Sequence, residues 1–276
     1  DVYKRQLEEV VVTAQKREES LQDAPIAITA ITESTIDDLD IANVVDLAGM
    51  APNVHIINTP SNNTAATIAM RGGTTINPAI TWEPTVGMYL DGVYLGKGQG
   101  SIFDVADLER VEILRGPQGT LYGRNTLGGA INLISKKPSG AGTSAKVTLG
   151  NYGLKQAQLI ADYEVGENIF TKVVLNNKKR GGYVKNVASP YQAANGVVPN
   201  TISSNTELDT INSKGVKFTI AYEGDKTSVN LSLDKTDQDN IPPFAQLTNT
   251  IPNWSTAFGV GAVSYTHLTL PTTPYV

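Results

Sequence analysis

Residues 108–138, LERVEILRGPQGTLYGRNTLGGAINLISKKP, combine two β-prone segments with a glycine-rich connection. A strand is predicted at residues 111–114, and Gly116-Pro117 ends it because proline lacks the amide donor that a sheet needs. A second strand is predicted at residues 130–134, after the last glycines. The connection lacks the lysine and Ser/Thr of a phosphate-binding loop, so tight turns are the better interpretation.

Short strands and short helices alternate upstream of this segment. Residues 26–32 and 54–57 are strand-like, whereas residues 34–39 and 43–50 are helix-like. This mixture predicts a compact α+β domain that ends near Pro138.

Local signals support several of these elements. Ser34 and Asn43 are predicted helix N-caps, because their side-chain oxygens can accept backbone N–H bonds in the first turn. Asp91-Gly92 lies between β-rich arms and predicts a type I′ hairpin turn, which requires positive φ at both central residues. A short helical turn is predicted at residues 104–108.

Beyond Pro138 the apolar residues recur at every second position, as expected for strands with one apolar face. In the clearest segment one face carries Ala157, Leu159, Ala161 and Tyr163, and the other carries Gln156, Gln158 and Asp162. The same period recurs at residues 146–149, 216–223 and 229–234. Residues 169–176 alternate less cleanly.

The predicted connections between these strands differ in length. Those near residues 151–153, 166–168 and 224–226 are tight, whereas residues 181–209 form a long connection. Short turns on one side and long loops on the other are typical of outer-membrane barrels. A soluble β-sandwich alternates in the same way, so periodicity alone leaves both architectures open.

Composition excludes some classes of protein. The chain has 22 Lys and Arg residues against 27 Asp and Glu residues and a net charge of −5, which argues against a nucleic-acid binder. The basic run at residues 178–180 is short and is predicted to be solvated. No cysteine is present, so there is no disulfide framework. No run of about 18 apolar residues occurs, so no transmembrane helix is expected.

Metal and catalytic motifs are also missing. The only histidines are His55 and His267, and neither belongs to a zinc motif. His55 is expected to be structural. Asp234, Asp237 and Asp239 miss the glycine and distal glutamate of a calcium-binding EF-hand, so a solvated segment is the simpler interpretation. We expect no metal, no cofactor and no catalytic residue.

Five segments together resemble the plug signature of TonB-dependent outer-membrane receptors. They are residues 8–14 (EEVVVTA), 21–28 (LQDAPIAI), 70–72 (MRG), 86–96 (VGMYLDGVYLG) and 108–138. They occur in the order and spacing of that family and cover roughly residues 7–138. The alternating strands behind them are what the family places next.

The resemblance implies an α+β plug domain followed by antiparallel transmembrane β-barrel strands, which here form an incomplete barrel. It divides the chain into a TonB-box region (7–20), the plug (21–138) and the first barrel strands (139–262). Residues 1–6 and 263–276 fit neither pattern and resemble translated adapter sequence, so we expect them to be non-native.

The resemblance also implies a function. The family takes up scarce solutes through the outer membrane of Gram-negative bacteria, most often ferric siderophores, and couples uptake to the inner-membrane proton gradient. The implied partners are the periplasmic protein TonB, outer-membrane lipid and a small solute such as a ferric siderophore, but no nucleic acid.

Two groups of functional residues follow from the resemblance. The TonB box would bind TonB by adding a strand through main-chain hydrogen bonds, although an ordinary edge strand would have the same composition. Its residues are Glu9, Val10, Val11, Val12, Thr13 and Ala14. The plug signature contributes charges that could pair with wall carboxylates such as Glu164 or Glu223, or else be solvated surface. Its residues are Arg71, Glu109, Arg110, Arg115, Gly116 and Arg124.

Two other classes of function remain as alternatives. A soluble periplasmic ligand-binding or signalling module would account for the α+β half of the chain. An enzyme built on the glycine-rich loop at residues 116–129 is the weaker alternative.

Overall fold

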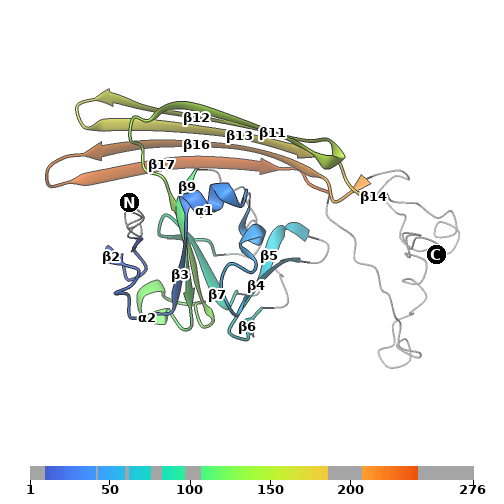
Figure 1. Cartoon of the computed structure of the whole chain (residues 1–276), viewed down its shortest axis with the longest axis horizontal. Helices are drawn as coiled ribbons and strands as arrows, with labels where there is room; N and C mark the ends of the chain where they lie inside the picture. Colours follow the sequence, from blue (N-terminus) through green and yellow to red (C-terminus); the bar gives the residue numbers. More distant parts are fainter. Residues whose placement is uncertain are drawn as a thin grey trace, which may run out of the picture.

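The computed structural model describes residues 10–41, 43–59, 62–75, 83–96, 107–185 and 207–241. They form two parts (Figure 1). The part up to residue 138 is a mixed α/β domain, here called the plug. The part beyond it is an antiparallel sheet, here called the wall, which arches over the plug.

A five-stranded sheet forms the centre of the plug. Its strands, in spatial order, are β3 (Ile28–Thr32), β9 (Leu108–Arg115), β10 (Gly129–Ser135), β7 (Val86–Leu90) and β8 (Val93–Tyr94). β10 is antiparallel to β9 and parallel to β7. The two strands predicted within residues 108–138 are therefore adjacent and lie in the middle of this sheet.

The other elements of the plug are short. A second sheet contains β4 (Val54–Thr59), β5 (Asn62–Met70) and β6 (Gly73–Thr74). An N-terminal hairpin contains β1 (Val11–Val12) and β2 (Glu19–Ser20). The helices are α1 (Glu33–Asp38), the 3₁₀ turn η1 (Val44–Leu47) and α2 (Gly119–Tyr122).

The plug has its own apolar core. Its fully buried members include Leu47, Ile56, Met70, Ile113, Ile131 and Leu133. These side chains come from both sheets and from η1, so the plug elements pack as one unit around a common centre.

Two of the predicted local signals are confirmed. Asp91 and Gly92 have φ angles of 50° and 82°, as a type I′ turn requires. Asn43 caps η1 by accepting the Val45 N–H, and Asp46 accepts the Asn43 N–H in return. The helix predicted at residues 43–50 is nevertheless only a 3₁₀ turn.

Two other local predictions need correction. Helix α1 begins at Glu33 with Thr32 at the N-cap, so the predicted cap at Ser34 is wrong. The Ser34 hydroxyl instead lies 2.9 Å from the Thr32 hydroxyl. Residues 104–106 of the predicted helical turn lie outside the described residues, and Leu108 belongs to strand β9.

The wall contains the strands predicted from the alternating pattern. In order they are β11 (Gly142–Gly150), β12 (Leu154–Gly166), β13 (Ile169–Arg180), β16 (Ile211–Glu223) and β17 (Ser228–Gln238), each antiparallel to its neighbours. A short turn, η2 (Asn151–Gly153), joins β11 to β12. The long connection between β13 and β16 includes the small pair β14 (Val184–Lys185) and β15 (Glu207–Leu208).

The two faces of the wall differ as the alternation predicts. On β12, Leu159 is 41% exposed, whereas Asp162 is buried on the face toward the plug. On β13, Leu175 is 42% exposed, whereas Lys172 and Val174 are buried. The outward face carries Val147, Leu149, Leu159, Tyr163, Val165, Leu175, Val216, Phe218, Tyr222, Val229, Leu231 and Leu233. The wall is therefore apolar outside and polar toward the plug.

The basic run at residues 178–180 differs from the prediction of a solvated surface. Lys178 is buried on the inward face of β13, and Arg180 forms a salt bridge of 2.8 Å with Asp209. Among the described residues, no helix has both the length and the apolar character needed to cross a membrane.

Candidate functional site at the plug–wall junction

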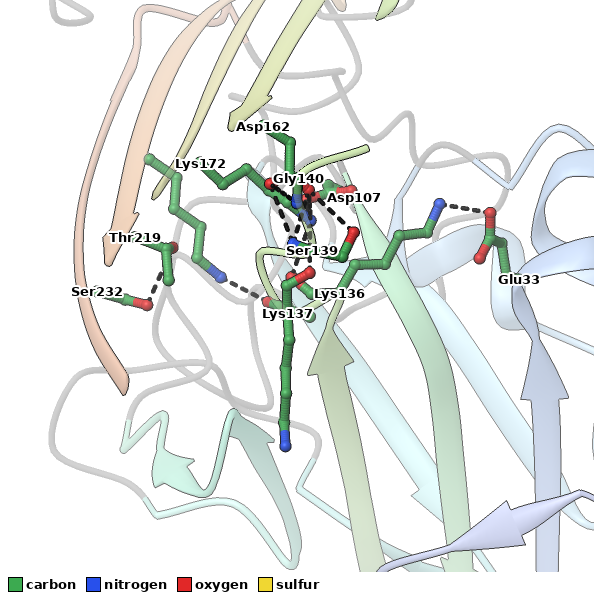
Figure 2. Close-up of polar contacts among 12 residues, drawn as sticks. Glu33, Asp107, Lys136, Lys137, Ser139, Gly140, Asp162, Lys172, Thr219 and Ser232 are labelled. Carbon is green, nitrogen blue, oxygen red and sulfur yellow. Dashed lines mark hydrogen bonds and ion pairs between the residues drawn. The ribbon is translucent and has the colours of Figure 1, made fainter. Parts of the chain in front are cut away.

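A buried lysine of the wall, Lys172 on β13, binds the end of the plug (Figure 2). Its ammonium nitrogen lies 3.2 Å from Asp107 Oδ2 and donates to the backbone carbonyls of Lys136 and Lys137, both at 3.1 Å. A lysine ammonium has three donors. All three can therefore be used on the plug, one on Asp107 just before β9 and two on the segment where the chain leaves the plug.

A wall carboxylate completes this junction. Asp162 on β12 lies 3.6 Å from the Lys172 nitrogen and accepts the backbone N–H groups of Ser139 and Gly140 at 3.0 and 2.9 Å. Lys172, Asp107 and Asp162 are each at most 6% exposed at the side chain. The first residues after the plug are thus fixed to two wall strands by charged groups that water does not reach.

The charges at this junction do not balance, because one lysine faces two carboxylates. Burial raises the pKa of Asp107 above its ordinary value of 3.8, although Lys172, Lys136 and Lys217 act in the opposite direction. One proton is therefore retained more readily on Asp107 than on a solvated carboxyl group.

Two further ion pairs connect the wall to the plug, and a third lies within the plug beside this interface. Lys146 of β11 lies 3.2 Å from Asp40, and Lys217 of β16 lies 3.1 Å from Asp91. Within the plug, Lys136 pairs with Glu33 at 2.5 Å (Figure 2). Across the interface, the lysines of these pairs come from the wall and the carboxylates come from the plug.

This distribution of charges is the reverse of the expected one, in which arginines of the plug would pair with Glu164 or Glu223 of the wall. Arg110 forms salt bridges with Glu109 and with Glu112, which is 2.9 Å away, so its charge is neutralised inside the plug. The local sequence explains the pair with Glu112, because alternate residues of one strand lie on the same face of a sheet.

Of the remaining signature residues, Arg115 ends β9, Gly116 and Arg124 lie in the glycine-rich connection after it, and Arg71 follows β5. The Arg71 guanidinium packs against Gly116, where an added Cβ would lie 2.8 Å from Nη1. Gly116 also has a φ of 106°, which favours glycine. Arg115 is half-buried, and exposed Arg124 lies 3.6 Å from Glu83. The structure therefore groups only some of these residues.

The segment predicted to be a TonB box is docked on the plug, although Glu9 lies outside the described residues. Val12 and Ala14 are fully buried, and Val11 is 43% exposed. The Thr13 N–H donates to Glu112 Oε1 at 2.7 Å. Of the charged residues after this segment, Lys16, Arg17 and Glu18 lie in the turn of the hairpin and Glu19 lies in its second arm, so they do not form an extended linker.

A cavity of about 240 Å³ lies between α1 of the plug and strands β11 and β12 of the wall. Its polar lining includes Asp37, Asp40, Asp107, Lys146, Gln156 and Gln158. The predicted even-numbered face of β12 thus contributes to a polar space between the plug and the wall.

Sequence reasoning missed three of the residues that matter most here: Lys172, Asp107 and Glu112. Lys172 is the one charge in the largely apolar residues 169–176, and Glu112 is a carboxylate within an otherwise apolar strand centre. A charged residue inside a strongly apolar segment was the signal in the sequence that could have identified such residues. Their partners lie up to 99 residues away, as for Thr13 and Glu112, so spacing could not identify them.

Asp234, Asp237 and Asp239 near the end of β17 are exposed. His55 is exposed on β4. Within the ranges that the structure describes, no group of three His, Cys, Asp or Glu residues could hold a metal ion.

The geometry defines a class of protein: a compact α+β domain lies against the polar face of an antiparallel sheet whose other face is apolar. This is the arrangement of a plugged outer-membrane barrel. Residues 20–130 match the family described as TonB-dependent Receptor Plug Domain. Residues 20–130, less than half of the chain, thus resemble the plug domain of TonB-dependent receptors.

Individual relatives agree with this assignment. The Catecholate siderophore receptor Fiu of Escherichia coli (strain K12) is 31% identical over 159 residues, which are 56% of this chain and 19% of that receptor. The Vitamin B12 transporter BtuB of Vibrio vulnificus (strain CMCP6) is 27% identical over 153 residues, 54% of this chain and 24% of the transporter. The chain thus spans about a fifth of the length of these curated relatives.

A solved structure has the same fold. The ferric yersiniabactin uptake receptor FyuA from Yersinia pestis superimposes with a TM-score of 0.62 at 20% sequence identity. The match covers 76% of this chain and 31% of that receptor.

Proposed function

We propose that this chain is part of an outer-membrane receptor of a Gram-negative bacterium that takes up a scarce solute. The solute that we propose is a ferric siderophore. The observation that carries the proposal is the two-faced wall. Its outward apolar face suits lipid, and its inward face binds a plug through buried Lys172 and Asp162. A soluble periplasmic module is less consistent, because it would leave this apolar face in water.

The solute class follows from the relatives, whose names mention a catecholate siderophore and ferric yersiniabactin. Cobalamin is a second candidate, because a relative of similar identity is a vitamin B12 transporter. We assign no catalytic residue, since transport of this kind forms and breaks no covalent bond in the solute.

Uptake by the full-length receptor tests this proposal. The receptor would be expressed in a strain that lacks its own siderophore and cobalamin receptors, and the cells would be supplied with labelled ferric siderophores or labelled cobalamin. We expect accumulation of a ferric siderophore that requires TonB. Uptake of cobalamin alone would show that the solute is cobalamin and not a ferric siderophore. Accumulation of neither solute would contradict the proposal.

We further propose that residues Glu9, Val10, Val11, Val12, Thr13 and Ala14 bind TonB by strand addition. The support is that β1 is only two residues long and that Val11 is partly exposed.

Proline substitutions test this assignment, because proline cannot donate to a sheet and constrains φ. Val11→Pro should abolish energised uptake while solute binding by the same cells stays unchanged, and Val11→Ala serves as the control. Uptake that survives Val11→Pro would make this segment an ordinary strand of the plug.

A further inference from the structure

The N-terminal strand β1 uses one of its two edges for pairing within the described part of the chain. The Val10 carbonyl accepts the Leu21 N–H at 2.9 Å, on the side of β2. Successive residues of an extended strand present their backbone groups to opposite edges. The backbone groups of Val11 and Thr13 therefore face the other edge, where a partner strand would have to add.

A buried carboxylate occupies this second edge. Glu112 of β9 is fully buried, and its Oε1 accepts the Thr13 N–H at 2.7 Å and lies 3.2 Å from the Thr13 hydroxyl. Arg110 and Asn132 donate to the same carboxylate at 2.9 and 3.3 Å and hold it in place. The Thr13 carbonyl accepts the Lys16 N–H at 2.9 Å, so both backbone groups of Thr13 are used.

The contacts around Thr13 strengthen the docked position. Ala14 packs in a cluster with Leu114 and Tyr122, and the Lys16 ammonium lies 4.6 Å from the centre of the Tyr122 ring. Besides the ladder with β2, two residues of β9 anchor this segment at Thr13: Glu112 accepts its N–H, and Arg110 donates to its hydroxyl at 3.1 Å. Only the bond to Glu112 uses the backbone N–H, and it is charge-assisted, a class about twice as strong as neutral bonds.

We propose that Glu112 is a latch that blocks strand addition to the N-terminal segment until it releases Thr13. This inference rests on the proposed function, in which TonB binds that segment. A partner strand and Glu112 compete for the same N–H group, so TonB can bind only the fraction of molecules in which the segment is undocked. The apparent affinity for TonB is lowered by that fraction.

Glu112→Gln in the full-length receptor tests the latch with little change in shape. The buried Asn132 Oδ1 has no hydrogen-bond partner among the described residues and can accept from the new amide after a side-chain flip. The bond to Thr13 then becomes neutral and weaker. We expect the dissociation constant for a purified periplasmic TonB fragment to fall about tenfold, with solute binding unchanged.

A nitroxide label at Val11→Cys gives a second readout that does not involve TonB. Its spectrum should show a larger mobile fraction in Glu112→Gln than in the parent. Arg17→Ala is the matched control, because Arg17 is in the same hairpin but is exposed and pairs only with its neighbours Gln15 and Glu19 among the contacts described.

The outcomes separate the latch from the proposed function. A folded Glu112→Gln receptor with the parental spectrum and parental TonB affinity would overturn the latch. If TonB bound neither receptor, the proposed partner would be wrong, and the spectrum of the label would still decide whether Glu112 holds the segment.

Discussion

Lys172 lies between two carboxylates that are hidden from water. Removing one partner of a buried ion pair leaves an uncompensated charge and typically costs about 3–5 kcal/mol. We therefore expect Lys172→Met to lower the free energy of unfolding of the full-length receptor in detergent by about this amount.

The matched control for this substitution is Lys146→Met. Lys146 also bridges the wall and the plug, through Asp40, but both side chains are more than half exposed. Exposed pairs contribute about 0–1 kcal/mol. Equal losses in both variants would show that the buried position of Lys172 has no special importance.

The raised pKa of Asp107 predicts an unusual dependence of the stability of the folded protein on pH. Because burial raises its pKa in the folded protein above 3.8, the folded state binds the proton more tightly than the unfolded chain does. Its stabilising contribution is complete below pH 3.8 and is lost as the pH rises through the folded pKa.

Comparison with Asp107→Asn isolates this contribution, since the amide does not titrate. As the pH falls from neutral toward 3.8, the parent should gain stability relative to Asp107→Asn. Denaturant titrations at several pH values measure the difference. A parent that loses stability relative to the variant over this range would show that the attraction of Lys172 outweighs burial.

At the scale of elements, the contact between β9 and β10 depends on Gly129. It has a φ of 150°, and an added Cβ would overlap the Leu114 carbonyl of β9 and the Met70 sulfur. Overpacking of this kind costs about 1–3 kcal/mol or more. Gly129→Ala should therefore destabilise the plug by at least this amount in thermal or denaturant unfolding.

Gly119→Ala provides the comparison for this prediction. Gly119 lies in α2, and an added Cβ would meet no atom within 4 Å. Alanine favours helix over glycine by about 0.5–1 kcal/mol. We expect no loss of stability, and an equal loss in both variants would show that the overlap at Gly129 does not limit packing.

At the scale of the whole molecule, the proposed function requires the wall to separate lipid from the plug. Leu159 lies on the outward face of β12, and Gln158 lines the polar cavity on the inward face. Arginine on the lipid face near the bilayer midplane costs about 2–4 kcal/mol. Leu159→Arg should thus reduce assembly of the full-length receptor in the outer membrane much more than Gln158→Arg.

Heat-resistant migration of the folded receptor and its amount in outer-membrane fractions measure this difference. Similar assembly of the two variants would contradict the assignment of the outward face to lipid. A selective defect in Gln158→Arg would place the lipid on the other face.

The sequence determined the elements whose cause is local. The type I′ turn at Asp91-Gly92 depends on two adjacent residues, and the cap at Asn43 depends on a residue three positions away. The alternation on β12 depends on the geometry of a single strand. These interactions act over a few residues, so patterns in the sequence were enough to predict them.

The tertiary structure decided which charges meet. Lys172, Asp107 and Asp162 come from different segments, and Thr13 reaches Glu112 across 99 positions. Arg110 was expected to face the wall, but the two nearest carboxylates of its own strand neutralise it. Pairing of charges depends on distance in space and on the loss of water around them, and both are set only when the plug packs against the wall.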